Sequence, residues 1–197
     1  MGEGRALVIE GAFGIICLQV SVPVTNTGSD TQYLDESTLN VEDASGNLVE
    51  SLSYVPAYPM VLLPGETGWY SLETMLDEVP ADDLTVVPEL DVKVAEMEPV
   101  QFEVSDFVLG NAGLGGIRME GNVVNTSDET VEMTYVAAQL YDENDPFLGL
   151  VLSTLTDVIE PGGSVPFTGG MMTGPEDLKV ETVARYELFA YPFQFQG

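Results

Sequence analysis

The chain has 197 residues and a formal net charge of −28, with 33 acidic and five basic side chains. Nucleic-acid binding requires lysine and arginine to replace the counterions of the phosphates, and anionic membrane surfaces also attract basic segments. The five basic residues are scattered along the chain, so the sequence predicts neither a nucleic-acid partner nor insertion into a membrane. Hydrophobic residues make up 45% of the chain, which is enough for a packed core.

Histidine is absent, and Cys17 is the only cysteine. The absence of histidine removes the commonest general base and the commonest metal ligand. A single cysteine excludes an intrachain disulfide and a zinc site built from cysteines. Cys17 lies in the apolar run GIICLQVSV, where we expect a buried core thiol, because no histidine is present to activate it as a nucleophile. The sequence therefore predicts a protein that is not an enzyme and has no catalytic residues.

The first expected element is a buried strand over residues 13–24, FGIICLQVSVPV. A signal peptide would need a positively charged start and a small-residue cleavage site. Here Glu3 and Glu10 precede or flank the apolar run, and Gln19 and Pro23 interrupt it. The valine and isoleucine content favours a strand. Whether a native leader or lipid anchor has been removed from this sequence stays open.

The rest of the chain has the residue usage of a β protein, with frequent valine, threonine, aromatic, glycine and proline residues. An alternating strand is expected at 130–142, TVEMTYVAAQLYD, because side chains of a strand point to its two faces in turn. The glycine-rich segment 110–116, GNAGLGG, lacks the lysine and the following helix of a phosphate loop, so we expect a hairpin connection there. One helical turn is expected within 74–83.

Several blocks of the first half recur in the second half in the same order. VTNTGSD (24–30) matches VVNTSDE (123–129), which aligns Asn26 with Asn125, and LNVED (39–43) matches AQLYD (138–142). LPGET (63–67) matches EPGGS (160–164), and ADDLTV (81–86) matches PEDLKV (175–180). Such ordered matches predict a tandem duplication, with domains at 1–98 and 99–197.

Each copy is expected to contain about six to eight short strands separated by turn residues, which is the spacing of an all-β sandwich. The sequence therefore predicts an all-β fold of two tandem immunoglobulin-like β-sandwich domains. Each copy of nearly one hundred residues also has the usual size of such a domain.

The second copy resembles the FxLYD family of bacterial and archaeal extracytoplasmic domains. The residues that carry the resemblance are Gly121, Val123, Asn125, Thr126, Leu140, Tyr141, Asp142, Pro161, Gly162 and Phe167. Ala138 stands where the family has phenylalanine, and the first copy matches less well, with Val41 and Glu42 in place of Leu-Tyr. The resemblance covers roughly the central half of each copy and implies an immunoglobulin-like sandwich on secreted or lipid-anchored cell-envelope proteins. It implies no reaction.

An acidic turn in each copy is a candidate cation site. Asp142, Asn144 and Asp145 cluster after the strand of the second copy, and Glu42, Asp43 and Asn47 lie at the matching place in the first. Clustered oxygen ligands suit Ca²⁺. Aspartate, asparagine and glycine are also the residues that hairpin turns require, so a structural turn is the favoured interpretation and Ca²⁺ the alternative.

An aromatic segment at 53–60, SYVPAYPM, has no counterpart in the second copy. It brings Tyr54 and Tyr58 close in sequence to Trp69 and Tyr70, which together form a candidate ligand-binding set. Aromatic side chains on loops are effective anchors for a protein or glycan partner. Core packing and proline-bounded edge strands explain the same residues.

The favoured function is a non-catalytic, extracytoplasmic interaction or scaffolding module that presents loops and strand edges to a protein or glycan at the cell surface. The main alternative is a carbohydrate-binding protein that uses the aromatic residues around 53–70, which requires those rings to be exposed and coplanar. A carboxylate-only hydrolase would need two close carboxylates in a deep pocket. An acidic mimic of nucleic acid would need a regular surface of carboxylates.

Overall fold

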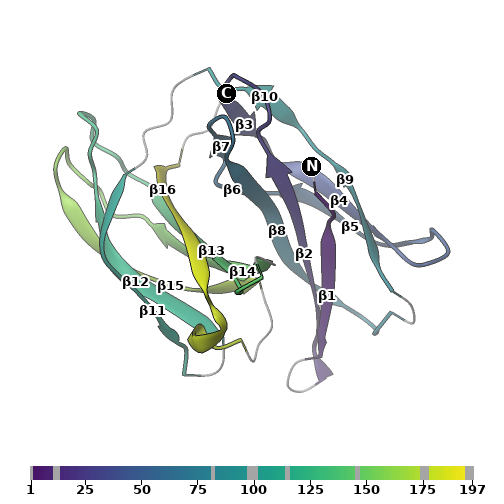
Figure 1. Cartoon of the computed structure of the whole chain (residues 1–197). Coiled ribbons are helices and arrows are strands. Elements are labelled where there is room, and N and C mark those ends of the chain that lie inside the picture. Colours follow the sequence, from purple (N-terminus) through teal and green to yellow (C-terminus); the bar gives the residue numbers. More distant parts are fainter. Residues whose placement is uncertain are drawn as a thin grey trace. The chain divides into compact units, whose positions relative to one another are not determined.

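The computed structural model describes residues 2–10, 14–80, 83–96, 102–113, 116–144, 147–173 and 178–193 (Figure 1). These residues form antiparallel strands in a sandwich-like arrangement, with a short 3₁₀ turn, η2, at Val180–Thr182. The predicted all-β fold is thus confirmed. The helical turn expected within 74–83 is wrong for the part described, since a strand continues to Leu76 and a bend follows at Asp77 and Glu78. Within the described ranges, no helix has the length and apolar character needed to cross a membrane.

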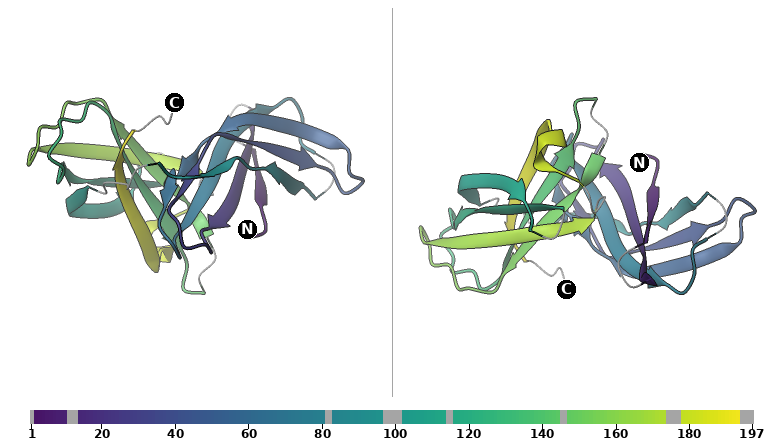
Figure 2. Two further views of the ribbon diagram at one scale, coloured as in Figure 1. Left: turned by 90° about the horizontal axis from the view of Figure 1, so that it is seen from above. Right: turned by 90° about the horizontal axis from the view of Figure 1, so that it is seen from below.

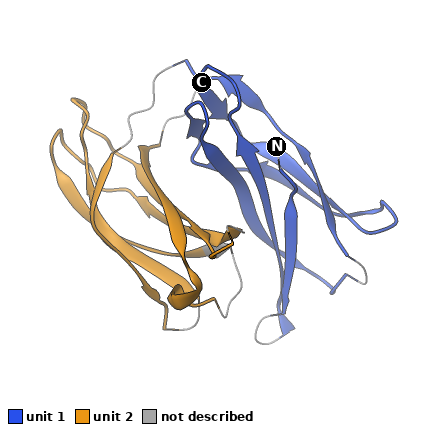
Figure 3. Ribbon diagram, viewed as in Figure 1, with its two compact units in different colours: residues 1–98 blue, residues 99–197 orange. Residues whose placement is uncertain are grey.

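The chain divides into two compact units, Met1–Glu98 and Pro99–Gly197 (Figure 3). Each unit has its own cluster of buried apolar side chains.

The described residues of unit 1 form ten strands, distributed over three small sheets (Figure 1). They are β1 (Arg5–Glu10), β2 (Ile16–Thr25), β3 (Gln32–Leu34), β4 (Ser37–Glu42), β5 (Leu48–Val55), β6 (Ala57–Tyr58), β7 (Val61–Leu62), β8 (Thr67–Leu76), β9 (Thr85–Glu89) and β10 (Val92–Val94). The sheet orders are β1-β2-β8-β6, β5-β4-β9 and β10-β3-β7. The sheets β1-β2-β8-β6 and β5-β4-β9 form two layers (Figure 2).

The core of unit 1 follows from the alternation of side chains along its strands. The even-numbered residues of β2 from Leu18 to Val24 join the core, together with Leu39 and Val41 of β4 and Tyr70 of β8. The odd-numbered residues of β2, including Cys17, lie on the opposite face of the sheet. Cys17 is therefore half-buried outside the core, and its expected place among the core side chains is wrong. The predicted strand over 13–24 is present as β2.

In unit 2 the residues that the structure describes form six strands in one hydrogen-bonded sheet, in the order β11-β12-β15-β14-β13-β16. Their bounds are β11 (Glu103–Asn111), β12 (Ile117–Val124), β13 (Thr134–Tyr141), β14 (Phe147–Leu155), β15 (Ser164–Thr173) and β16 (Arg185–Pro192). The predicted hairpin around 110–116 joins β11 and β12, and Gly116 has a φ of 73° and accepts the N–H of Ala112. A positive φ is the reason for glycine at this turn.

The sheet of unit 2 folds over a single core. Met119 and Val123 of β12 and Phe167 of β15 share this core with Val136 and Leu140 of β13. The two ends of the sheet also meet, since the N–H of Phe102 donates to the carbonyl of Ala190 at 2.8 Å. Closure of this kind pairs backbone groups that an open edge would leave unpaired.

A buried asparagine organises one loop in each unit. The Nδ2 of Asn26 donates to the carbonyls of Asp30 and Leu62, and its Oδ1 accepts the N–H of Gly28. In unit 2 the Nδ2 of Asn125 donates to the carbonyls of Glu129 and Ile159, and its Oδ1 accepts the N–H of Ser127. We call these two arrangements the asparagine loops.

The backbone around the asparagine loops also matches. The carbonyl of Asn26 accepts the N–H of Gly65, and that of Asn125 accepts the N–H of Gly162. Both glycines directly follow a proline in the turn, and both have a positive φ, 88° for Gly65 and 71° for Gly162. The two loops are therefore built from the same hydrogen bonds at aligned sequence positions.

Strand register extends the correspondence between units and corrects one aligned block. Val41 lies opposite Val86 in β9, and the aligned residue Leu140 lies opposite Tyr186 in β16. Val86 thus corresponds in position to Tyr186. The alignment of ADDLTV with PEDLKV, which matched Val86 with Val180, is wrong at that residue because Val180 lies in η2, before β16 begins.

Thr134 is fully buried, and its Oγ1 is the one buried side-chain oxygen or nitrogen of the described residues that lacks a hydrogen-bond partner. Replacing Thr134 with valine keeps the branched shape and removes the unsatisfied hydroxyl. We expect the free energy of unfolding to rise by about 1 kcal/mol in urea denaturation. Thr134→Ser keeps the hydroxyl and loses a buried methyl, so it should lower stability by about 1 kcal/mol. A less stable valine variant would contradict this assignment.

Candidate functional site

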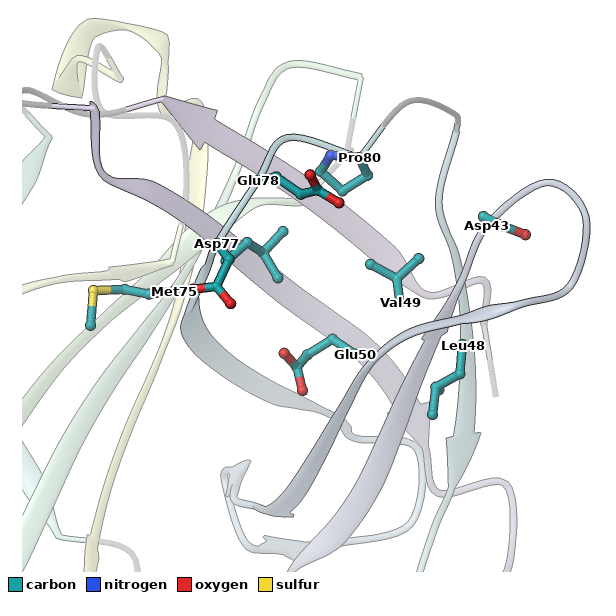
Figure 4. A pocket seen from close by; sticks show the side chains of 9 residues that line it. Asp43, Leu48, Val49, Glu50, Met75, Asp77, Glu78 and Pro80 are labelled. Atoms are coloured by element: carbon teal, nitrogen blue, oxygen red, sulfur yellow. The ribbon is translucent and has the colours of Figure 1, made fainter.

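An open hollow of about 470 Å³ lies in unit 1 between the start of β5 and the end of β8 (Figure 4). Its origin is the divergence of two antiparallel segments. β6, which directly follows β5, pairs with β8 through Ala57–Tyr70 and Tyr58–Trp69. β5 itself pairs with β4 in the other sheet, from Val55 back to Leu48. β5 and β8 therefore separate towards the start of β5, and the hollow occupies the space between them.

Both acidic and apolar side chains line the hollow, and none of the described lining residues is basic. The described residues that line it are Asp43, Leu48, Val49, Glu50, Met75, Leu76, Asp77, Glu78 and Pro80. Figure 4 shows the carboxylates of Glu50 and Asp77 pointing into the space between the two segments, whereas Met75 points away from them. Leu76 packs against the core of unit 1 and supplies an apolar floor. We call this feature the acidic hollow.

The Asp43 carboxylate at one side of the hollow is held by its own turn. Its Oδ1 accepts the N–H groups of Ser45 and Asn47, and its Oδ2 accepts the Nδ2 of Asn47. The side-chain hydrogen bond from Asn47, helped by the backbone N–H groups, lowers the pKa of Asp43 below its ordinary value. Asp43 therefore serves the turn that the sequence predicted, and its oxygens are already engaged.

The candidate cation site of the second copy is placed only in part. The Oδ1 of Asp142 accepts the N–H of Asn144 at 2.6 Å, which is the hydrogen bond of a turn that begins with aspartate. Asp145 lies outside the described residues. Within the described ranges no group of three or more acidic or cysteine side chains is arranged to hold a metal ion. The geometry at Asp43 and Asp142 favours the turn interpretation.

The four candidate aromatic residues do not gather on one exposed surface. Tyr70 is fully buried in the core, and Tyr58 is only 9% exposed. Tyr58 and Trp69 lie opposite each other in the β6–β8 pair, on the face away from Tyr70. Only Tyr54 is largely exposed, at 77%. Tyr58 and Tyr70 therefore do not meet the requirement of the carbohydrate-binding alternative for exposed rings.

Tyr70 has a structural role that explains a polar hydroxyl at a core position. Its hydroxyl donates to the carbonyl of Asp35 at 2.9 Å and lies 3.2 Å from that of Asp91. Burial raises the pKa of Tyr70 to about 12. At the same corner the Lys93 ammonium lies 2.5 Å from a carboxylate oxygen of Asp35, and this hydrogen bond lowers the pKa of Asp35. These bonds tie the β3–β4 corner to the β9–β10 corner.

No family model matches the chain, and the search of curated proteins found no significant relative. The interpretation of the site therefore depends on its geometry and on residue chemistry alone.

The acidic hollow itself was not predicted from the sequence. Asp43 was noted as part of a turn, but Glu50, Asp77 and Glu78 are three of 33 acidic residues and no spacing distinguishes them. The carboxylates lie around a wide, open hollow with an apolar floor. Such a surface suits binding of a positively charged partner group better than acid–base chemistry, which needs enclosed carboxylates with shifted pKa.

Proposed function

We propose that the protein is a non-catalytic, extracytoplasmic interaction module made of two tandem immunoglobulin-like β-sandwich domains. The observation that carries the proposal is Tyr54, an exposed tyrosine whose backbone has a φ of 60°. Tyr54 lies in β5 at a β-bulge, where the pairing with β4 passes from Ser37–Val55 directly to Leu39–Leu52. Positive φ is rare for a bulky side chain and costs on the order of 1–3 kcal/mol.

A fold that retains such strain at a solvent-exposed ring gains nothing in core packing from it. Backbone strain of this kind clusters at ligand-binding positions, and tyrosine is favoured at the centres of protein interfaces. β-bulges also serve to redirect a side chain at a strand end. Tyr54 is therefore the residue of the sequence-predicted aromatic set that is suited to contact a partner.

The asparagine loops and the matching strand registers support the proposed duplication. The resemblance of the second copy to FxLYD domains supports the proposed cell-envelope or secreted location and a protein or glycan partner. The carbohydrate-binding alternative needs several exposed coplanar rings, and the burial of Tyr58 and Tyr70 does not favour it.

The test is selection of ligands for the intact chain from a displayed peptide library and from a panel of cell-envelope polysaccharides, followed by affinity measurement with Tyr54→Asn. Asparagine tolerates positive φ, so this variant should fold with equal or greater stability. We expect it to bind the selected ligand at least about tenfold more weakly, as loss of an interface anchor would produce.

Val158→Asn is the matched control, because Val158 is 56% exposed and lies in unit 2, remote in sequence from Tyr54. It should leave the affinity within about twofold of the wild type. A selected ligand whose affinity is the same for Tyr54→Asn and the wild type would remove the basis of the proposal, as would the failure of every probe to bind.

A further inference from the structure

The acidic hollow is flanked by two strand segments with unpaired edges. In the described part of unit 1, β5 pairs with β4 on one side and with no strand on the other. β8 pairs with β2 along its whole length, but its other side meets β6 only at Trp69 and Tyr70. The N–H of Ser71 then donates to the carbonyl of Pro56, and no strand continues the pairing along Leu72–Leu76.

An unpaired edge can accept a further strand, because its outward N–H and C=O groups are a template for backbone hydrogen bonds. The two edges differ in how far they are protected. On β5 the N–H of Ser51 is occupied by the side chain of its neighbour Glu50, at 2.9 Å from Oε1. No such bond from a neighbouring acidic side chain is present along Leu72–Leu76. The edge of β8 is therefore the better template.

The charge of the hollow selects the chemistry of the occupant. Glu50, Asp77 and Glu78 surround the space, with no basic side chain in the lining. Within the described ranges, these carboxylates do not form a group that could hold a metal ion. A chain carrying several separated positive charges on one face suits such a spread of carboxylates, because alternate side chains of an extended segment point to the same face.

We propose that the acidic hollow binds an extended, lysine- or arginine-bearing segment of a partner protein by strand addition along Leu72–Leu76. The proposal deepens the proposed interaction function, on which it rests, by assigning a second surface and the chemistry of its partner. The segment pairs through its backbone with the β8 edge. Its alternate basic side chains lie beside Glu50, Asp77 and Glu78.

The test uses a synthetic peptide of alternating lysine and valine as the probe, with the intact chain at physiological ionic strength. Its affinity is compared with that of the same peptide N-methylated at alternate residues, which keeps the charge and removes the backbone donors. We expect the N-methylated peptide to bind at least about tenfold more weakly. Amide hydrogen exchange should show new protection within Leu72–Leu76 when the unmodified peptide is bound. Equal binding of the two peptides, or no new protection, would overturn strand addition.

The variant Glu50→Gln/Asp77→Asn/Glu78→Gln removes three charges from the hollow, and Asp128→Asn/Glu129→Gln/Glu132→Gln removes three from exposed positions of unit 2. We expect the first to weaken peptide binding about tenfold or more and the second about twofold or less. Equal losses would mean that the peptide responds only to net charge, which overturns the assignment. If the hollow variant keeps full affinity for a ligand that depends on Tyr54, the interaction function stands regardless of the outcome at the hollow.

Discussion

Replacing Asn125 with alanine is expected to lower the free energy of unfolding of unit 2 by about 3 kcal/mol. The side chain is fully buried and donates to the carbonyls of Glu129 and Ile159, both at 2.8 Å. Its Oδ1 accepts the N–H and the hydroxyl of Ser127. Alanine would leave buried backbone groups without these partners, and each such group costs roughly 1–3 kcal/mol.

Urea denaturation followed by circular dichroism is the suitable measurement, because the single tryptophan, Trp69, lies in unit 1 and does not report directly on unit 2. Asn122→Ala, in the strand β12 that ends just before Asn125, is the matched control, since its Nδ2 makes one exposed bond, to Asp106. It should cost about 0.5 kcal/mol or less. An equal loss of unfolding free energy in the two variants would show that the buried hydrogen bonds of Asn125 add no more stability than an exposed one.

Asn26→Ala extends the same experiment to unit 1 and should lower the stability of that unit by a similar amount, because its hydrogen bonds are the counterparts of those of Asn125. Here the fluorescence of Trp69 provides the measurement. A large cost in one unit and none in the other would argue against equivalent asparagine loops.

Replacing Tyr70 with phenylalanine is expected to cost about 1–2 kcal/mol at neutral pH. The change removes the donor to the carbonyl of Asp35 and the second contact with that of Asp91. It leaves the ring in the core, so the apolar packing is preserved. Tyr54→Phe removes a hydroxyl from an exposed ring and is the control for stability, with an expected change within about 0.5 kcal/mol.

The cost of Tyr70→Phe should shrink at alkaline pH, and the sign follows from the raised pKa. Burial moves the pKa of Tyr70 from 10.0 to about 12, so the folded state keeps the proton that the unfolded state loses. This contribution is complete below pH 10 and is lost as the pH rises to about 12. The contribution to the free energy of unfolding that is lost over this range is roughly 2–3 kcal/mol.

Phenylalanine has no such proton, and the loss exceeds the cost expected at neutral pH, so the stability curves of the two proteins should approach each other and cross between pH 10 and about 12. Comparison of the two curves also cancels the contribution of Tyr58, whose pKa is likewise raised by burial. Urea denaturation across this pH range gives the two curves. Parallel curves would contradict the assignment of the raised pKa to Tyr70.

The fold class could be predicted from local patterns. β2 was predicted because its apolar run contains valine and isoleucine, and the hairpin before β12 because glycine recurs there. The matched blocks pointed to Asn26 and Asn125 as aligned residues, and both make the same hydrogen bonds. These features depend on neighbours in sequence or on alternation along one strand, which the sequence records directly.

The candidate site depended on information of another kind. Tyr54 and Tyr70 are both tyrosines in β-rich segments, yet one is 77% exposed and the other fully buried. Their difference arises from strand register, since a shift of one residue moves a side chain to the other face. The bulge that exposes Tyr54 appears only in the pairing of β4 with β5.

The sequence by itself determined the all-β class, the main turns, the aligned asparagines and the acidic surface that disfavours nucleic acids. Only the tertiary structure decided that Tyr70 ties two corners together, that Asp43 is held by its own turn, and that β5 and β8 diverge around an acidic hollow. The physical reason is that composition and periodicity are local properties of the chain. A hollow instead arises where two strands that are separate in sequence pair with different strands.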